Sequence, residues 1–209
     1  MTNFSDVLGL HLPAGFKLRD WQKRFLTTFL NKCVTEKKSS FLLEACPAAG
    51  KSIGQMCPAY ILRNLGLIKW TTVVVPTDHL RTQMGVEIYK IFGLDLYYGT
   101  DRFAIEDYQG EVITYAQLAA NPNLYKARCA LFGNRVMVVG DEIHHLGEKN
   151  SWGQAFKTAF SDVAYRLLTS GTPFRSDNQK ILGDCINYKL DQEGNYISVP
   201  DFRIVNQNR

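Results

Sequence analysis

One segment near residue 50 has the residue types of a phosphate-binding loop. It reads ACPAAGKS and lies between an apolar run and a helix-like stretch. Consecutive backbone N–H groups in such a loop surround an anion, and the N-terminal end of the following helix reinforces the attraction. We expect the cradle to be formed by Ala48, Ala49 and Gly50. Lys51 would reach the β and γ phosphates of a nucleotide, and the Ser52 hydroxyl would bind Mg²⁺. The alternative is a turn that only caps a helix.

A second segment ends in two consecutive carboxylates. Residues 138–145 read VVGDEIHH, so Asp141 and Glu142 directly follow an apolar run. In a parallel sheet the carboxyl ends of the strands meet at one edge, where the phosphate loop also lies. We expect Asp141 to hold Mg²⁺ and Glu142 to polarise an attacking water as a general base. Such a pair can also be a plain helix cap, but its combination with the phosphate loop favours the functional interpretation.

Two histidines follow the carboxylates. His144 and His145 are adjacent, and a zinc site is one reading of them. No cysteine or acidic cluster stands at ligand spacing from this pair, which disfavours that reading. We expect His144 to form hydrogen bonds between the nucleotide site and a neighbouring element.

The rest of the chain supplies the elements that position these residues. Short apolar runs, each typical of a strand covered on both faces, occupy residues 41–45, 71–76, 111–115, 135–140 and 164–169. Helical patterns lie between them, at residues 20–33, 51–65, 78–92 and 151–160. Asp20 and Asp78 stand where N-caps belong, and Pro58 should kink or shorten the second helix. The alternation predicts an α/β fold with a largely parallel central sheet and helices on both faces.

Composition narrows the class of protein. The 209 residues are 45% hydrophobic, which permits a sizeable core and excludes a disordered chain. No apolar run is long enough to cross a membrane, and the N-terminus has no basic region typical of a secretory signal. The net charge of +4 is scattered, so it permits an anionic partner without requiring one. Five cysteines without a CxxC pair indicate reduced thiols and a cytoplasmic protein.

Three sequence motifs occur in the order that they have in a known family of proteins. ACPAAGKS, GDEIHH and LTSGTPFRSD resemble motifs I, II and III of superfamily 2 helicases and translocases. Within this superfamily, the motifs resemble those of the DEAD/DEAH group, which includes type III restriction-enzyme translocase subunits and phage helicases. The resemblance covers about residues 16–178 and implies a RecA-like domain that binds ATP and Mg²⁺. It implies movement on nucleic acid, with DNA favoured over RNA, in the cytoplasm of a bacterium or of a phage host.

The resemblance assigns further residues by position. Gln22, in FKLRDWQ, takes the place of an adenine-reading glutamine, with Phe16 able to stack nearby; a surface glutamine is the alternative. Segments 76–83 and 113–118 resemble motifs Ia and Ib, whose loops hold a nucleic-acid backbone. The residues suited to phosphate contacts are Thr77, Arg81, Thr114 and Tyr115. Ordinary loop polarity, or a core position for the tyrosine, is the alternative for each.

The third motif predicts a link between hydrolysis and movement. Ser170 and Thr172 would connect the nucleotide site to a neighbouring domain, with His144 as an intermediary. Arg175 is either a contact to that partner domain or a solvated arginine. Helicases of this superfamily carry a second RecA-like domain with catalytic arginines, and no motif of it is visible after residue 178.

The predicted organisation is therefore a RecA-like ATP-binding domain at 1–178 and a segment at 179–209. That second segment is a C-terminal extension or the start of the connection to a missing second domain, as a hairpin or an extended tail. The predicted function is that of an ATP hydrolase coupled to movement on nucleic acid, weakly active by itself. The alternatives are a nucleotide-dependent switch or scaffold, and a nucleic-acid-binding module with an idle ATP site. The intact Lys51, Ser52, Asp141 and Glu142 disfavour the last of these.

Overall fold

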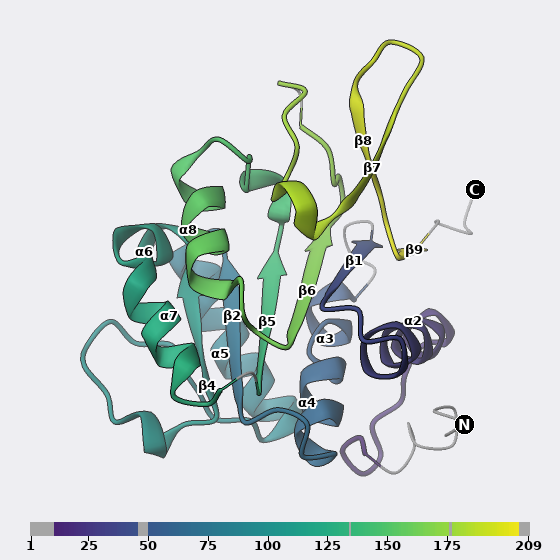
Figure 1. Cartoon of the computed structure of the whole chain (residues 1–209). Helices are drawn as coiled ribbons and strands as arrows, with labels where there is room; N and C mark the ends of the chain where they lie inside the picture. Colours follow the sequence, from purple (N-terminus) through teal and green to yellow (C-terminus); the bar gives the residue numbers. More distant parts are fainter. Residues whose placement is uncertain (1–10, 46–49, 134, 176, 205–209) are drawn as a thin grey trace.

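A seven-stranded parallel sheet forms the centre of the molecule (Figure 1). The computed structural model describes residues 11–45, 50–133, 135–175 and 177–204. The strand order is β3-β4-β2-β5-β6-β1-β9. The strands are β1 (Ser40–Ala45), β2 (Trp70–Val75), β3 (Leu96–Tyr97), β4 (Gly110–Thr114), β5 (Val136–Asp141), β6 (Tyr165–Ser170) and β9 (Phe202–Ile204). The predicted α/β class with a parallel sheet is confirmed, and each of the five predicted strands lies within about one residue of an observed one.

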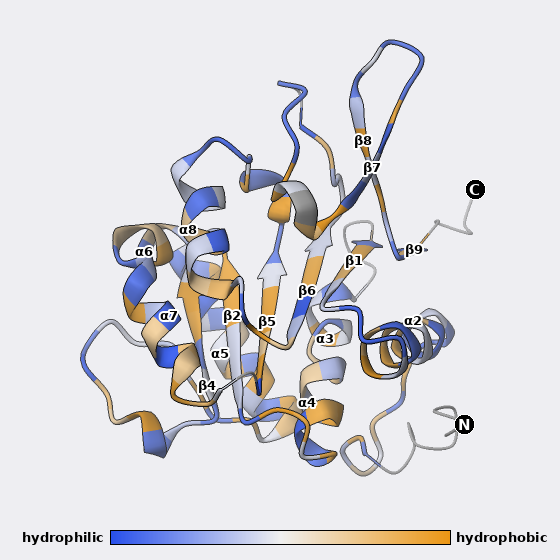
Figure 2. Ribbon diagram, viewed as in Figure 1, coloured by the Kyte–Doolittle hydropathy of each residue, from blue (hydrophilic) through white to orange (hydrophobic). Residues whose placement is uncertain are grey.

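The sheet is covered on both faces because its strands are apolar on both. In β1, Phe41 and Leu43 belong to one hydrophobic core and Leu42 to the other. In β5, Val139 faces the first core and Val138 the second. Successive side chains of a strand point to opposite faces, so a continuous apolar run requires helices on each side. Figure 2 shows orange stretches in these strands, with paler ones between them.

Seven helices provide the two covering layers in the described part of the chain. One face carries α2 (Asp20–Leu30), α3 (Lys51–Gly54), α4 (Cys57–Asn64) and α5 (Asp78–Phe92). The other carries α6 (Tyr115–Ala120), α7 (Pro122–Ala130) and α8 (Ser151–Phe160) (Figure 1). Single helical turns occur at Asn31–Thr35, Ile105–Asp107, Ile143–His145 and Gly183–Cys185. The layers match the predicted helices on both faces, although α6 and α7 have no counterpart among the predicted helical patterns.

Local chemistry explains where the helices begin and end. The helix predicted for 51–65 is divided into α3 and α4, and Pro58 stands in the first turn of α4, where its missing N–H costs no helical hydrogen bond. The N-caps predicted at Asp20 and Asp78 are wrong by one residue. Arg19 and Thr77 hold those positions, and the Thr77 hydroxyl accepts a hydrogen bond from the Leu80 N–H. Both aspartates instead lie in the first turn, where a negative charge is favourable.

The C-terminal segment adds a hairpin and an edge strand. β7 (Asn187–Leu190) and β8 (Tyr196–Val199) form an antiparallel hairpin that projects beyond the carboxyl edge of the sheet (Figure 1). β9 then pairs in parallel with β1. Asp201 anchors this return: its carboxylate accepts hydrogen bonds from Lys32 Nζ at 2.9 Å and from the Leu42 N–H at 2.9 Å. The hairpin is thus one of the two predicted forms, while the domain boundary at residue 178 stays a prediction.

Two further features concern membrane-spanning segments and the cysteines. Within the described ranges, no helix is both long enough and apolar enough to cross a membrane. The four cysteines among these residues, Cys33, Cys57, Cys129 and Cys185, are free thiols. Burial raises the pKa of Cys33 and of Cys57 to about 12, so both thiols stay protonated at neutral pH.

Candidate functional site

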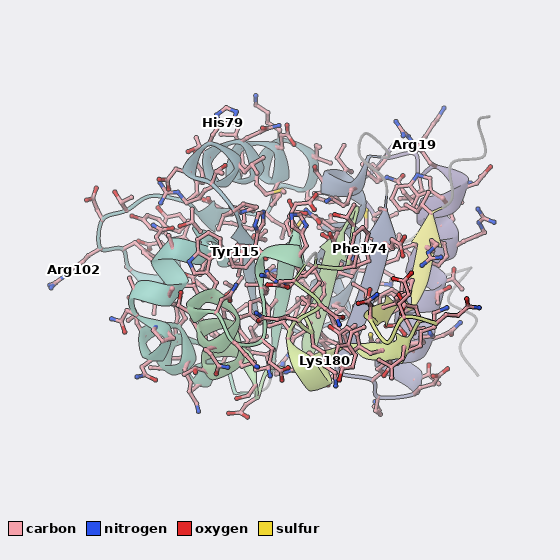
Figure 3. The ribbon with its side chains drawn as sticks, turned by 90° about the horizontal axis from the view of Figure 1, so that it is seen from above. Arg19, His79, Arg102, Tyr115, Phe174 and Lys180 are labelled. Atoms are coloured by element: carbon pink, nitrogen blue, oxygen red, sulfur yellow. The ribbon has the colours of Figure 1, made fainter. Side chains whose placement is uncertain are left out.

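The candidate site lies at the carboxyl edge of the sheet, which Figure 3 shows from above. Helix α3 begins at Lys51, directly after Gly50. Gly50 has a φ of 81°, a left-handed backbone conformation that favours glycine over residues with a Cβ. The loop predicted between β1 and α3 lies outside the described residues at positions 46–49, which include Ala48 and Ala49. Ser52 is exposed in the first turn of α3.

Lys51 joins the two motifs that the sequence places far apart. Its Nζ lies 3.2 Å from Asp141 Oδ1 and forms a closer ion pair with Glu142 Oε1. The Lys51 side chain is 12% exposed, against 8% for Asp141 and 31% for Glu142. Two carboxylates therefore share one ammonium group, and the cluster carries a net negative charge. The two segments predicted to form one site are therefore in contact at Lys51, and their roles in binding a nucleotide stay a prediction.

Asp141 is held from a neighbouring strand. The Oγ1 of Thr169, in β6, lies 2.9 Å from Asp141 Oδ1 and 2.9 Å from Gln55 Oε1. Gln55 is fully buried between α3 and α4, and its Nε2 has no hydrogen-bond partner in the described structure. Thr169 and Gln55 are not among the residues predicted from the sequence. The parallel pairing of β5 with β6, which sets Asp141 opposite Thr169, is the signal that identifies the threonine.

Glu142 occupies a special backbone position. Its φ of 52° is left-handed, which is uncommon for a residue other than glycine and marks a sharp change of direction after β5. Burial raises the pKa of Glu142, but the Lys51 hydrogen bond and charge, aided by His144, outweigh burial and leave that pKa below its ordinary value. The carboxylate is therefore ionised at neutral pH, the form that a general base requires.

The predicted coupling residues lie together beside Glu142. His144 Nδ1 lies 3.1 Å from Ser170 Oγ and 3.4 Å from Glu142 Oε2. Ser170 Oγ lies 3.4 Å from the same carboxylate oxygen and accepts a hydrogen bond from the Thr172 N–H at 3.1 Å. A continuous polar path therefore runs from Glu142 to the loop that follows β6. The structure brings these residues together, and their coupling role stays a proposal.

Arg175 lies at the far end of the same path. Its Nη1 donates to the His144 backbone carbonyl at 2.9 Å, and its Nε donates to Asp177 Oδ1 at 2.9 Å. The side chain is 22% exposed. Arg175 thus fastens the loop after β6 to the turn that carries His144, an arrangement that neither sequence-based alternative describes.

Gln22 contacts the start of α3. Its Oε1 accepts a hydrogen bond from the Arg19 N–H at 2.8 Å, and its Nε2 donates to the Gly50 carbonyl at 3.4 Å. A Cβ at Gly50 would lie 3.4 Å from Arg19 Nη1, so this arginine also lies against the loop, and the sequence analysis missed it. Phe16 packs on Phe92, with ring centroids 5.6 Å apart. The adenine-reading role of Gln22 stays a prediction.

The residues predicted to bind a nucleic-acid backbone differ in exposure. Thr77 is exposed at the start of α5, whereas Arg81 and Thr114 are 8% and 4% exposed. The Nη2 of Arg81 lies 3.2 Å from Asp78 Oδ1, while its Nε and Nη1 have no hydrogen-bond partner in the described structure. The Thr114 hydroxyl caps α6 by accepting from the Gln117 N–H. Arg81 therefore retains unused donors, whereas Thr114 is already engaged.

Tyr115 occupies a core position. Its side chain is fully buried, and its hydroxyl donates a hydrogen bond to the Asp141 backbone carbonyl at 2.8 Å. Figure 3 shows Tyr115 within the molecule as seen from above this edge. The expectation that this hydroxyl meets a phosphate does not agree with this placement, because the ring packs in the core and stacks on Trp152 of α8.

The oxygen donors at this edge fit Mg²⁺. Asp141 offers a carboxylate and Ser52 a hydroxyl, the hard oxygen ligands that this cation prefers, and the surplus negative charge of the cluster favours a cation. Over residues 11–45, 50–133, 135–175 and 177–204, no group of three or more His, Cys, Asp or Glu side chains is arranged to hold a metal ion. His144 and His145 contact each other through their rings, with centroids 4.2 Å apart.

Comparison with solved structures places the fold. The chain superposes on the SWI2/SNF2 ATPase core of Sulfolobus solfataricus, solved in complex with dsDNA, with a TM-score of 0.63 and 20% identity over 78% of this chain and 33% of that one. It superposes on the Hef helicase domain of Pyrococcus furiosus with a TM-score of 0.56 and 16% identity, over 75% of this chain and 33% of that one. The fold is thus that of RecA-like helicase domains.

Sequence comparison gives the family. An uncharacterized protein of Mycobacterium leprae is 38% identical over 180 residues, which are 85% of this chain and 29% of that protein. One of Mycobacterium tuberculosis is 36% identical over 85% of this chain and 28% of its own length. The chain thus spans less than a third of these relatives. The sequence profile of the family described as "Type III restriction enzyme, res subunit" matches residues 15–175. The chain therefore belongs to this family of superfamily 2 helicases.

Proposed function

We propose that this chain is the nucleotide-binding domain of an ATP-driven motor that moves on nucleic acid, with DNA favoured over RNA. The observation that carries the proposal is the contact of Lys51 with Asp141 and Glu142. The lysine and Glu142 are 91 residues apart in the sequence, yet they meet at the edge of a parallel sheet where ligands bind. Membership of a helicase family supports the same conclusion.

The chain's own residues would bind the nucleotide at this edge. The backbone around Gly50 and the start of α3 would face the phosphates, and Gln22 would face the base. Ser52 and Asp141 would hold Mg²⁺, and ATP with Mg²⁺ supplies an electrophilic phosphorus atom when bound. Lys51 must turn from the carboxylates toward the phosphates, which frees both acidic side chains for their tasks.

Glu142 would then act on water. Its ionised carboxylate accepts a proton from the attacking water, a role typically worth about 10²–10⁴-fold in rate. Thr169 keeps the adjacent Asp141 in place through a hydrogen bond of 2.9 Å. Ser170 and His144 contact the same oxygen of Glu142, so a movement of this carboxylate would displace the loop after β6.

Contacts to nucleic acid would come from the ends of β2 and β4. Thr77 at the start of α5 offers an exposed hydroxyl. The unpartnered guanidinium donors of Arg81 suit phosphate oxygens but are buried, so this side chain would need to turn outward to reach them. Thr114 would need to exchange its capping role for such a contact. Contacts of this kind carry no sequence information, so we expect binding that tolerates any base sequence.

Efficient hydrolysis needs positive charge beyond Lys51. An arginine supplied across a domain interface is worth roughly 10³–10⁵ in rate in related phosphoryl-transfer enzymes. The chain spans less than a third of its curated relatives, and we propose that a second RecA-like domain supplies this arginine. The 209-residue chain alone should therefore bind nucleotide and hydrolyse it slowly.

Calorimetric titration of the 209-residue chain with Mg-ATP tests the assignment of the loop. Wild type should bind, and Lys51→Ala should bind at least about tenfold more weakly, because the phosphates lose a charge-assisted partner. Lys23→Ala is the matched control, since Lys23 is 59% exposed on α2 and pairs with Asp20. Equal affinity of wild type and Lys51→Ala would remove this loop from the proposal.

A further inference from the structure

Tyr115 connects two strands that are not neighbours. It follows β4 directly, and its hydroxyl reaches the backbone carbonyl of Asp141 at the end of β5. In the sheet β2 lies between β4 and β5, so the side chain spans the end of one whole strand. The bond is 2.8 Å long and the tyrosine is fully buried. Removal of the donor would leave the buried carbonyl oxygen without a hydrogen bond and would destabilise the folded state.

The acceptor of this bond lies in the peptide group that joins the two carboxylate residues of the site. A peptide unit is planar, so the direction of the Asp141 carbonyl fixes the direction of the Glu142 N–H. The same unit leads into the left-handed φ of 52° at Glu142, a conformation that the surroundings must maintain. By holding the carbonyl, the Tyr115 hydroxyl holds the orientation from which both carboxylates project.

The tyrosine ring is itself held by a stacked neighbour. The ring of Trp152, from α8, stacks on it at 5.7 Å between centroids and 21° between planes. Trp152 also contacts His145, with centroids 6.1 Å apart, in the turn after Glu142. Burial, with the nearby Asp141 and Glu142 charges, raises the pKa of Tyr115 well above its ordinary value, so the hydroxyl keeps its proton and remains a donor.

The β4–α6 junction is stiff where Tyr115 begins. The Thr114 hydroxyl accepts a hydrogen bond from the Gln117 N–H at 3.1 Å, and the Gln117 Oε1 accepts one from the Thr114 N–H at 2.8 Å. This reciprocal pair is a capping box, which fixes the first turn of α6 relative to β4. A shift of the junction therefore carries the tyrosine with it.

We propose that Tyr115 is a positioning residue that transmits displacement of the β4–α6 junction to the Asp141–Glu142 peptide. This inference rests on the proposed function, in which Thr114 at that junction meets the nucleic-acid backbone. Tyr115 then couples occupation of the nucleic-acid site to the geometry of the general base. It acts through the backbone of Asp141 and touches neither nucleotide nor nucleic acid.

The test uses the full-length gene product and steady-state ATP hydrolysis with and without saturating random-sequence duplex DNA. Tyr115→Phe removes one hydroxyl and keeps the ring. The DNA-stimulated kcat should fall about tenfold, the factor for roughly 1.4 kcal/mol lost with one buried hydrogen bond. The KM for ATP should stay within about twofold, because the hydroxyl makes no nucleotide contact. Tyr188→Phe is the matched control: its hydroxyl also bonds a backbone carbonyl, that of Ile181, away from the site.

The outcomes separate the two proposals. If wild type hydrolyses no ATP, the proposed function fails and takes this inference with it. If wild type is stimulated by DNA and Tyr115→Phe is stimulated equally, the inference alone is overturned. A matching loss in Tyr188→Phe would also overturn it, by showing a general effect of lost stability. Should Tyr115→Phe melt below the assay temperature, Trp152→Leu keeps the hydroxyl bond, removes the stacked ring, and should reduce stimulation in the same direction.

Discussion

Replacing Glu142 with glutamine separates binding of the nucleotide from its hydrolysis. Glutamine keeps the size of the side chain but removes the charge that pairs with Lys51 and accepts a proton from water. Turnover should fall by about 10²–10⁴-fold, the usual contribution of a general base. The nucleotide should nevertheless bind, because Gly50, Lys51 and Ser52 remain in place.

The structure also sets the size of the change in affinity. In the wild-type chain Lys51 must leave Glu142 before it meets the phosphates, and Glu142 is 31% exposed. A partly exposed ion pair is worth up to about 1 kcal/mol, so its removal should tighten ATP binding by up to about fivefold. Asp141 keeps its own contact with Lys51 at 3.2 Å, which limits the gain.

Two assays on the same preparation measure both effects: phosphate release by the full-length gene product, and titration with Mg-ATP. Glu148→Gln is the matched control, because Glu148 also pairs with a lysine, Lys157, at 3.4 Å outside the site. It should change neither turnover nor affinity. Unchanged turnover in Glu142→Gln would refute the general-base assignment, and a large loss of ATP affinity would refute the proposed competition for Lys51.

Two further predictions concern stability and nucleic acid. Burial, partly offset by Arg128, raises the pKa of Glu111 from 4.5 to about 7. Because the pKa of Glu111 is higher in the folded than in the unfolded chain, protonation of this carboxyl stabilises the fold. The stabilisation is complete below the pKa of the unfolded chain and is lost as the pH rises through about 7. Urea titrations measure the free energy of unfolding of wild type and of Glu111→Gln. The difference between the two should fall by roughly 3 kcal/mol as the pH rises from 4.5 to about 7. A difference that does not change with pH would contradict this burial effect. Arg81→Gln should weaken DNA binding, measured by fluorescence anisotropy, and should reduce the slope of log K against log salt concentration by about 0.7–0.9. Arg24→Gln, at an exposed position, is the control and should change neither. An unchanged slope in Arg81→Gln would exclude a phosphate contact from Arg81.

The strands and the meeting of the two motifs could be predicted because each depends on local patterns and one general rule. Continuous apolar runs identify buried parallel strands, and the carboxyl ends of such strands share an edge. From these two statements Lys51 and Asp141 are expected at one site. The division of the helix at Pro58 follows from the ring's missing N–H, which is equally local.

The features that could not be predicted depend on contacts between distant segments. The hydroxyl of Tyr115 could have faced solvent or the core, and only packing of α6 against α8 decides that it meets Asp141. Thr169 meets Asp141 because β6 lies beside β5, and it meets Gln55, in the turn after α3, because β6 also lies beside β1; no sequence motif indicates this strand order. The pairing of β9 with β1 depends on Asp201 and its lysine partners, a set with no sequence motif.

Phosphate release by the full-length gene product, with and without DNA, tests most directly whether this chain drives an ATP-dependent motor on nucleic acid. We expect DNA to raise the rate of ATP hydrolysis, and the Lys51→Ala variant to abolish that rate with or without DNA. The 209-residue chain alone should release phosphate slowly and respond little to DNA, because we propose that a second RecA-like domain supplies part of the catalytic charge. No ATP hydrolysis by the full-length protein under any condition, or hydrolysis that Lys51→Ala leaves intact, would contradict the account.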